Sequence, residues 1–150
     1  MTWRTHAAQG AICAAIASPY LTVRETAALF LSIVFIDVDH YFDFVAVCKR
    51  YSIRDMFRFH QYVWDHKYGV YGINVFHTFE VFGALFLLGW ADRIFWVALA
   101  GFLAHMALDL ISLWRNGILF NRAFSIIEYV IRKRNPATKG YPVPEEGFWE

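Results

Sequence analysis

The sequence predicts an all-α fold: a polytopic helical membrane bundle with about four transmembrane helices and further amphipathic helices at the membrane interface. Hydrophobic residues make up 58% of the 150-residue chain and charged residues only 18%, and the mean hydropathy is +0.35. Soluble domains contain about 45–50% apolar residues. A soluble protein of this size has a large surface relative to its core, which so few charges would cover poorly. A lipid-facing surface removes this conflict.

Four apolar stretches are candidate spans. The first is shorter than the ~20 residues that a span needs, and Pro19 follows it, which does not continue a helix. Asp92 and Arg93 separate the last two stretches, so we expect these two to form a helical hairpin. The four stretches are His6 to Ser18, Leu21 to Phe42, Tyr71 to Ala91 and Ile94 to Trp114.

Two other segments, Asp43 to Gly69 and Asn116 to Arg134, mix apolar and basic residues. Such a composition is typical of helices that lie in the membrane interface. From Asn135 onward Pro, Gly and Glu are frequent, which indicates a loose tail. We therefore predict one helical membrane domain, residues 1–134, and a tail, residues 135–150.

The distribution of Lys and Arg predicts the orientation in the membrane. Arg24 and Arg93 are the basic residues of the loops at one end, and each stands beside an acid. Both chain termini are thus expected on the cytoplasmic side of the inner (plasma) membrane, in contact with lipids. The net charge of +1 gives no overall indication of nucleic-acid binding. At the other end the basic residues are Arg4, Lys49, Arg50, Arg54, Arg58, Lys67, Arg115, Arg122, Arg132, Lys133, Arg134 and Lys139.

On this topology nine histidines and acids in or next to the spans fall in the cytoplasmic half. His77 and Glu80 are three residues apart, and His105 and Asp109 are four apart, so each pair shares a helix face. Asp39 and Asp43 are also four residues apart. The full set is His6, Asp37, Asp39, His40, Asp43, His77, Glu80, His105 and Asp109.

A divalent metal ion would explain this cluster. A charge near the middle of a membrane costs ~2.5–3.5 kcal/mol on insertion scales, and a cation compensates several carboxylates at once. Mixed imidazole and carboxylate ligands suit Zn, our first expectation, as well as Mn or Fe, and one or two ions can be held. Asp39 and Glu80 are the candidate catalytic carboxylates, Glu80 as a general base or a further ligand. The expected ligands are His6, Asp37, Asp39, His40, His77, His105 and Asp109.

The order of these residues resembles that of the YdjM-type family of inner-membrane metal-dependent hydrolases, and the resemblance implies a metal site and a hydrolase. The chain departs from the family pattern where a His-Arg pair is replaced by Gly72 and Ile73, and where a Pro is replaced by Ile36. The matching stretches, spread over most of the chain from residue 5 to about 113, are Thr5-His6, Phe35 to His40, Phe76 to Thr78 and Gly101 to Asp109.

Our leading hypothesis is a membrane-embedded hydrolase that cleaves a phosphoester or related bond of a lipid or lipid-linked substrate at the cytoplasmic side. The main alternative is a non-catalytic metal-binding or ion-transport protein that uses the same cluster. Transport would require polar residues in both membrane halves, yet Val81–Trp90 and Ile94–Leu103 are almost wholly apolar. A haem-binding bundle would place acids beside the iron, and a membrane scaffold would leave the buried acids unexplained. A homodimer stays open.

Overall fold

The computed structural model describes residues 3–66, 71–136 and 140–150, and its architecture is all-α, as predicted. Among these residues the β-structure is one parallel pair of two-residue strands, β1 (Gly72–Ile73) and β2 (Arg122–Ala123), which places Gly72 opposite Arg122. The α-helices are α1 (Trp3–Ala17), α2 (Val23–Phe35), α3 (Asp39–Cys48), α4 (Ile53–Asp65), α5 (Phe79–Leu88), α6 (Ile94–Arg115) and α7 (Ile126–Lys133). Short 3-10 helices are η1 (Ser18–Tyr20), η2 (Ile36–Val38), η3 (Val75–His77), η4 (Leu119–Asn121) and η5 (Glu146–Trp149).

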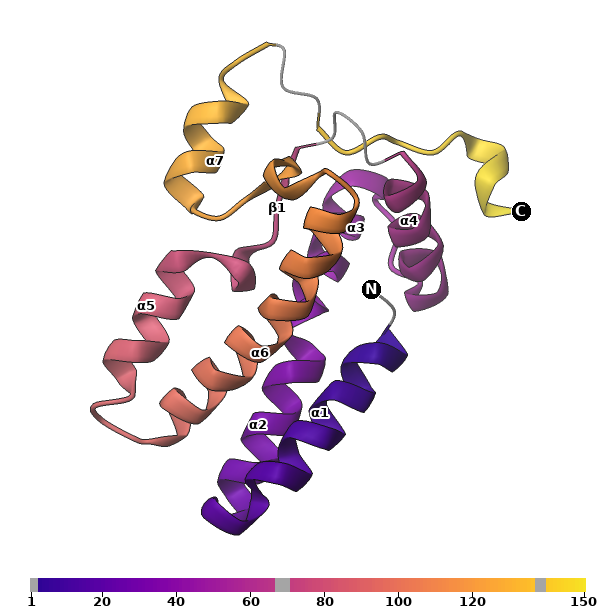
Figure 1. Ribbon diagram of the computed structural model, residues 1–150. Coiled ribbons are helices and arrows are strands. Elements are labelled where there is room, and N and C mark those ends of the chain that lie inside the picture. Colours follow the sequence, from indigo (N-terminus) through magenta and orange to yellow (C-terminus); the bar gives the residue numbers. More distant parts are fainter. Residues whose placement is uncertain (1–2, 67–70, 137–139) are drawn as a thin grey trace.

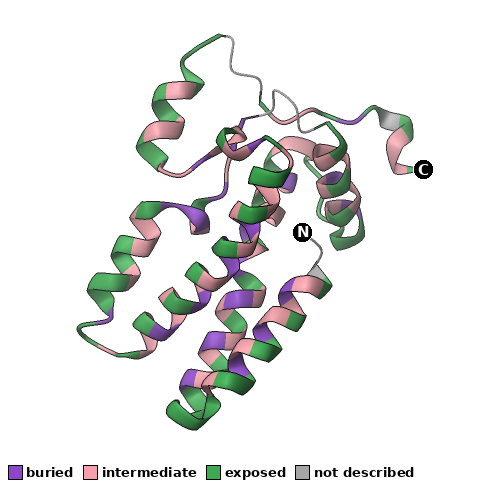
Figure 2. Cartoon of the chain, in the orientation of Figure 1, coloured by how far each residue is buried: buried purple, intermediate pink, exposed green. Residues whose placement is uncertain are grey.

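Four helices form an elongated bundle, and the remaining elements gather at one end of it (Figure 1). Helix α2 packs against both α1 and α6, and α5 packs against α6. Helices α3, α4 and α7 and the C-terminal segment lie at the end where α2 and α6 arrive together (Figure 1). Outward-facing positions of the bundle are largely exposed or half-buried (Figure 2).

The packing of α2 against α6 depends on the cap that starts α2 and on a glycine in α6. Thr22 begins α2 with a capping box, in which its hydroxyl accepts from the backbone N–H of Glu25 and the Glu25 carboxylate accepts from the backbone N–H of Thr22. Further along, a Cβ added to Gly101 of α6 would lie 1.9 Å from the Ser32 hydroxyl oxygen of α2. A larger residue would have to displace the Ser32 hydroxyl, so Gly101 favours the close approach of the two helices, one turn before His105.

One helix of the described residues, α6, is long and apolar enough to span a membrane, with 22 residues and a hydropathy of 2.0. The other predicted spans are shorter helices of 15 (α1), 13 (α2) and 10 (α5) residues. A span needs ~20 residues, so helix lengths do not support the prediction of four spans. The second stretch is short because α2 ends at Phe35 and the chain turns through η2.

The two segments predicted to be interfacial do contain amphipathic helices. Helix α7 exposes Ile127, Val130 and Ile131 on one side. The segment 43–69 holds the second part of α3 and all of α4, and its residues 67–69 lie outside the described part. Lys67 and Lys139, which entered the orientation argument, also lie outside it.

The C-terminal segment, for which a loose tail was expected, makes specific contacts at this end. Arg58 of α4 donates hydrogen bonds to the backbone oxygens of Phe148 and Trp149. The Trp149 ring lies 6.1 Å from that of Phe44 in α3. Residues 140–150 thus cover part of α3 and α4.

Candidate metal centre

Four of the predicted ligands converge at the point where α2 ends against α6. Asp37 comes from η2, His77 from η3, and His105 and Asp109 from consecutive turns of α6. Each offers one ligand atom, and these four atoms all lie within 4.8 Å of one another. The Nε2 atoms of His77 and His105 lie 3.4 and 3.3 Å from the same oxygen, Oδ1 of Asp37. The two rings are completely buried.

Several of the converging atoms are buried without a hydrogen-bond partner. They are Nε2 of His77, Nε2 of His105 and Oδ1 of Asp37. Buried polar groups are normally paired, since an unpaired group costs about 1–3 kcal/mol. A divalent cation can satisfy imidazole lone pairs and carboxylate oxygens simultaneously, so the donor set fits a divalent metal ion.

Hydrogen bonds at Nδ1 of His77 and His105 hold the two rings in the orientation that a metal requires. Nδ1 of His105 lies 2.8 Å from the carbonyl oxygen of Ile33, which can only accept, so Nδ1 carries the hydrogen. Nδ1 of His77 lies 3.2 Å from Oδ2 of Asp39, which also accepts from the backbone N–H of Phe76 at 3.0 Å. In the neutral ring each Nε2 then keeps a lone pair, which is the usual arrangement of metal-bound histidines.

His6 also reaches this centre. Its Nε2 lies 3.7 Å from Asp37 Oδ2 and 3.9 Å from Asp109 Oδ1, and its ring stacks on that of His105 with 3.9 Å between centroids. Both ring nitrogens of His6 are buried without a hydrogen-bond partner. Helix α1 can therefore supply a fifth ligand.

The remaining predicted residues have different places. Asp39 and His40 form a second group with Asp37, again with ligand atoms within 4.8 Å of one another. The main contacts of Asp39, with His77 and Phe76, are those of a group that orients a ligand. Glu80 lies outside both groups: its Oε1 accepts from the Ser125 hydroxyl at 2.5 Å and from the backbone N–H of Ile126 at 3.0 Å. It thereby fixes the start of α7.

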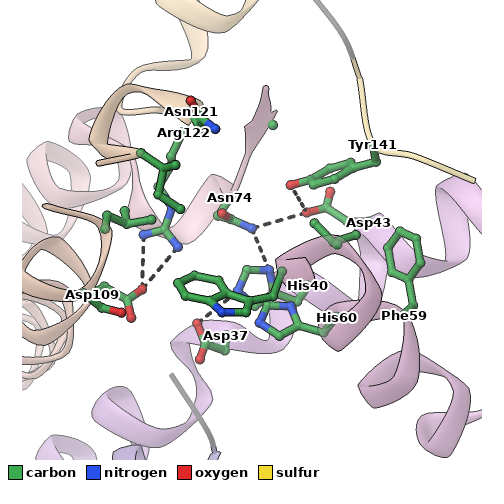
Figure 3. Close-up of a pocket in the computed structure, with 16 residues that line it drawn as sticks. Asp37, His40, Asp43, Phe59, His60, Asn74, Asp109, Asn121, Arg122 and Tyr141 are labelled. Atoms are coloured by element: carbon green, nitrogen blue, oxygen red, sulfur yellow. Dashed lines mark hydrogen bonds and ion pairs between the residues drawn. The ribbon is translucent and has the colours of Figure 1, made fainter. Parts of the chain in front are cut away.

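A pocket of about 120 Å³ opens beside the centre, and Asp37, His40 and Asp109 form its inner wall (Figure 3). Its other polar walls bring together segments that are far apart in the sequence. These are Asp43 of α3, His60 of α4, Asn74, Ser112 of α6, Asn121 and Arg122, and Tyr141 of the C-terminal segment.

Arg122 is the pocket residue best suited to bind a substrate, because its side chain carries a positive charge. Its Nη1 and Nη2 each lie 3.2 Å from Oδ2 of Asp109, and its side chain is 11% exposed. A guanidinium beside candidate metal ligands favours an anionic guest. In the sequence Arg122 was one of many basic residues at this end, and no local signal set it apart.

Three titratable groups of the pocket lie outside the predicted spans and have shifted pKa values. Burial raises the pKa of Asp43 to about 6, and the nearby negative charge of Asp39 acts in the same direction. Burial also raises the pKa of Tyr141, which donates a hydrogen bond to Asp43. Burial and the neighbouring His40 lower the pKa of His60 to about 3. His60, expected at the surface, instead lies against His40, with 4.5 Å between ring centroids.

Comparisons with family models, curated proteins and solved structures give no match to this chain. The resemblance to the YdjM-type family therefore stays a prediction, and function has to be argued from the centre and the pocket.

Proposed function

We propose that this chain is a membrane-embedded, metal-dependent hydrolase that acts on a phosphoester or related bond of a lipid or lipid-linked substrate at the cytoplasmic side. The observation that carries the proposal is the convergence of buried, unpartnered ligand atoms from Asp37, His77 and His105 on one point. Asp109 and His6 complete the proposed ligand set. Zn is the expected metal, since imidazole and carboxylate ligands suit it.

A bound divalent ion would supply Lewis acidity, lowering the pKa of a coordinated water and offsetting negative charge on a phosphate. The protein's own groups do the rest. Asp39 and the Ile33 carbonyl hold the two histidine rings in place. Arg122 faces the pocket beside Asp109, where its guanidinium can bind a phosphate oxygen and orient the ester.

Two features support a membrane location for this chemistry. Helix α6 is long and apolar enough to span, and the bundle exposes large apolar side chains such as Ile16, Leu87 and Leu103 (71%, 69% and 50% exposed). Lipid would cover such a surface, whereas water would not favour it. A lipid substrate could reach the pocket from this surface without leaving the membrane.

The cytoplasmic placement of the pocket rests on the arginines at the two ends. At the end away from the pocket, Arg24 pairs with Asp92 at 3.2 Å and Arg93 with Glu25 at 3.3 Å. The pocket end carries the majority of the basic residues, including Arg132 and Lys133 of α7. This asymmetry follows the positive-inside rule. An ion-transport role is less well supported, since Ile94–Leu103 of α6 offers no polar path to the other side.

The test is elemental analysis of detergent-purified protein, with wild type, His105→Ala and the control His66→Ala compared. His66 is exposed and contacts Tyr62 of the preceding helix α4, so its loss should leave the centre unchanged. We expect about one or two equivalents of Zn, Mn or Fe in wild type and control, and a loss of that metal in His105→Ala.

Phosphate release from phosphatidate in mixed micelles, before and after chelation and reloading with Zn²⁺, then tests the reaction. Activity that follows the metal content supports the hydrolase. Stoichiometric metal without turnover of phosphatidate or other lipid phosphoesters would favour the non-catalytic metal-binding alternative. A wild type without metal, even after reloading, would refute the proposal.

A further inference from the structure

The side-chain amide of Asn74 fixes the proton position on His40. Its Nδ2 lies 2.7 Å from Nδ1 of His40 and 3.3 Å from Oδ2 of Asp43 (Figure 3). An amide nitrogen carries two hydrogens and no lone pair that accepts, so it can donate to both neighbours. The reversed amide would set its oxygen against the Asp43 oxygen that already accepts from the Tyr141 hydroxyl. The donating orientation is therefore the one that satisfies all these groups.

Since Nδ1 of His40 accepts a hydrogen bond, the hydrogen of its neutral ring is on Nε2. That atom lies 3.3 Å from Oδ1 of Asp37. A nitrogen can bind a metal only through a lone pair, so Nε2 of His40 does not bind one while Asn74 donates to Nδ1. His77 and His105 have the opposite arrangement, because their Nδ1 atoms donate to Asp39 and to the Ile33 carbonyl.

We infer that His40 is a hydrogen-bond donor at the pocket wall and not a metal ligand, although its Nε2 lies close to the ligand cluster. Its ring is 17% exposed and lines the pocket. Its N–H thus stands between the Asp37 carboxylate and the space where a guest would lie. This assignment divides the predicted ligand set. His77 and His105 bind the metal, and His40 donates a hydrogen bond in the pocket.

The catalytic meaning of His40 rests on the proposed function. In the hydrolase, its N–H can donate to an oxygen of the anionic substrate as it enters beside Arg122. The chain from Tyr141 through Asp43 and Asn74 to His40 then acts as a support that holds this hydrogen in place.

Two measurements on the full-length protein test the inference. The first is a long-range ¹⁵N–¹H correlation spectrum of protein labelled at histidine, with signals assigned through single His→Gln variants. We expect the Nε2–H form for His40 and the Nδ1–H form for His77 and His105. An Nδ1–H form of His40, or a doubly protonated ring, would overturn the inference. Asn74→Asp replaces the donor by an acceptor, and it should move the His40 hydrogen to Nδ1.

The second measurement counts imidazole ligands of Zn²⁺ by X-ray absorption in wild type, His40→Ala and His77→Ala. We expect the same count in His40→Ala as in wild type and one fewer in His77→Ala. Loss of an orienting group lowers metal affinity by about 10–100-fold, so the samples are compared at saturating Zn²⁺. A count reduced by one in His40→Ala would overturn the inference. A wild type that binds no Zn²⁺ would refute the proposed function, while the tautomers would still decide the role of His40.

Discussion

The pair between Asp109 and Arg122 predicts a large loss of stability when the acid alone is neutralised. Both side chains are mostly buried, at 9% and 11% exposed, and two guanidinium nitrogens lie 3.2 Å from one carboxylate oxygen. Removing one partner of such a buried pair costs about 3–5 kcal/mol. Asparagine keeps an oxygen that accepts from Arg122, so Asp109→Asn should fall near the lower limit, about 3 kcal/mol.

At about 2–4 °C per kcal/mol for a chain of this size, the melting temperature of Asp109→Asn should fall by roughly 6–12 °C. The assay is thermal unfolding by circular dichroism in detergent after chelator treatment, so that no metal contributes. Asp92→Asn is the matched control, because its pair with Arg24 is exposed (42% and 71%) and such pairs contribute about 0–1 kcal/mol.

The double variant Asp109→Asn/Arg122→Met separates folding from metal binding. It removes the unpaired buried cation and should recover most of the lost stability, yet remain deficient in metal because Asp109 is still absent as a carboxylate. A melting temperature of Asp109→Asn equal to that of Asp92→Asn would refute the reasoning. So would a double variant as unstable as the single one, since the cost would then not come from Arg122.

Three further predictions follow from the packing and from the pocket. Gly101→Ala should destabilise the protein by about 1–3 kcal/mol and lower its metal content, because the new Cβ would lie 1.9 Å from Ser32 Oγ. A Cβ at Gly83 meets nothing within 4 Å, so Gly83→Ala should be neutral or stabilise α5 by up to about 1 kcal/mol. Thermal unfolding compares the two variants. The pKa of Asp43 is raised to about 6, so the wild type loses stability as pH rises from about 4 to 6. Asp43→Asn should be the more stable protein above pH 6 and lose that advantage below about pH 4. A difference in melting temperature between the two proteins that stays constant across that range would contradict this. Glu80→Gln should keep the full metal content by elemental analysis, since Glu80 holds the start of α7; loss of one equivalent would return it to the ligand set.

Much of the centre could be predicted because its ligands follow simple helical spacing. His105 and Asp109 lie on one uninterrupted apolar helix, so the four-residue spacing was sufficient to place both on one side. His77 and Asp37 followed from the expectation that buried acids and imidazoles collect where a cation can compensate them. These four residues are indeed brought together.

The failures have a common physical cause, which is the position of helix ends. The pairing of His77 with Glu80 assumed one helix through both residues, but His77 belongs to η3 and α5 begins at Phe79. The spacing rule therefore did not apply. Likewise, no Pro or Gly marks the end of α2 at Phe35, so the turn that points Asp37 into the cluster could not be seen. Arg122 was missed because its contact with Asp109 depends on the pairing of β2 with β1.

Gly72, which lies opposite Arg122 in the pairing of β1 with β2, indicates when the pocket forms during folding. A Cβ at Gly72 would lie 2.2 Å from the Tyr141 hydroxyl, so the strand pair and the C-terminal segment close over the same backbone atom. The Tyr141–Asp43 contact spans 98 positions of sequence, and Gly72 pairs with a strand 50 residues later. Contacts of such long sequence separation form late, after the entropy of loop closure has been overcome. We expect the helical bundle, with His105 and Asp109 already in place, to form before the pocket that would select a substrate.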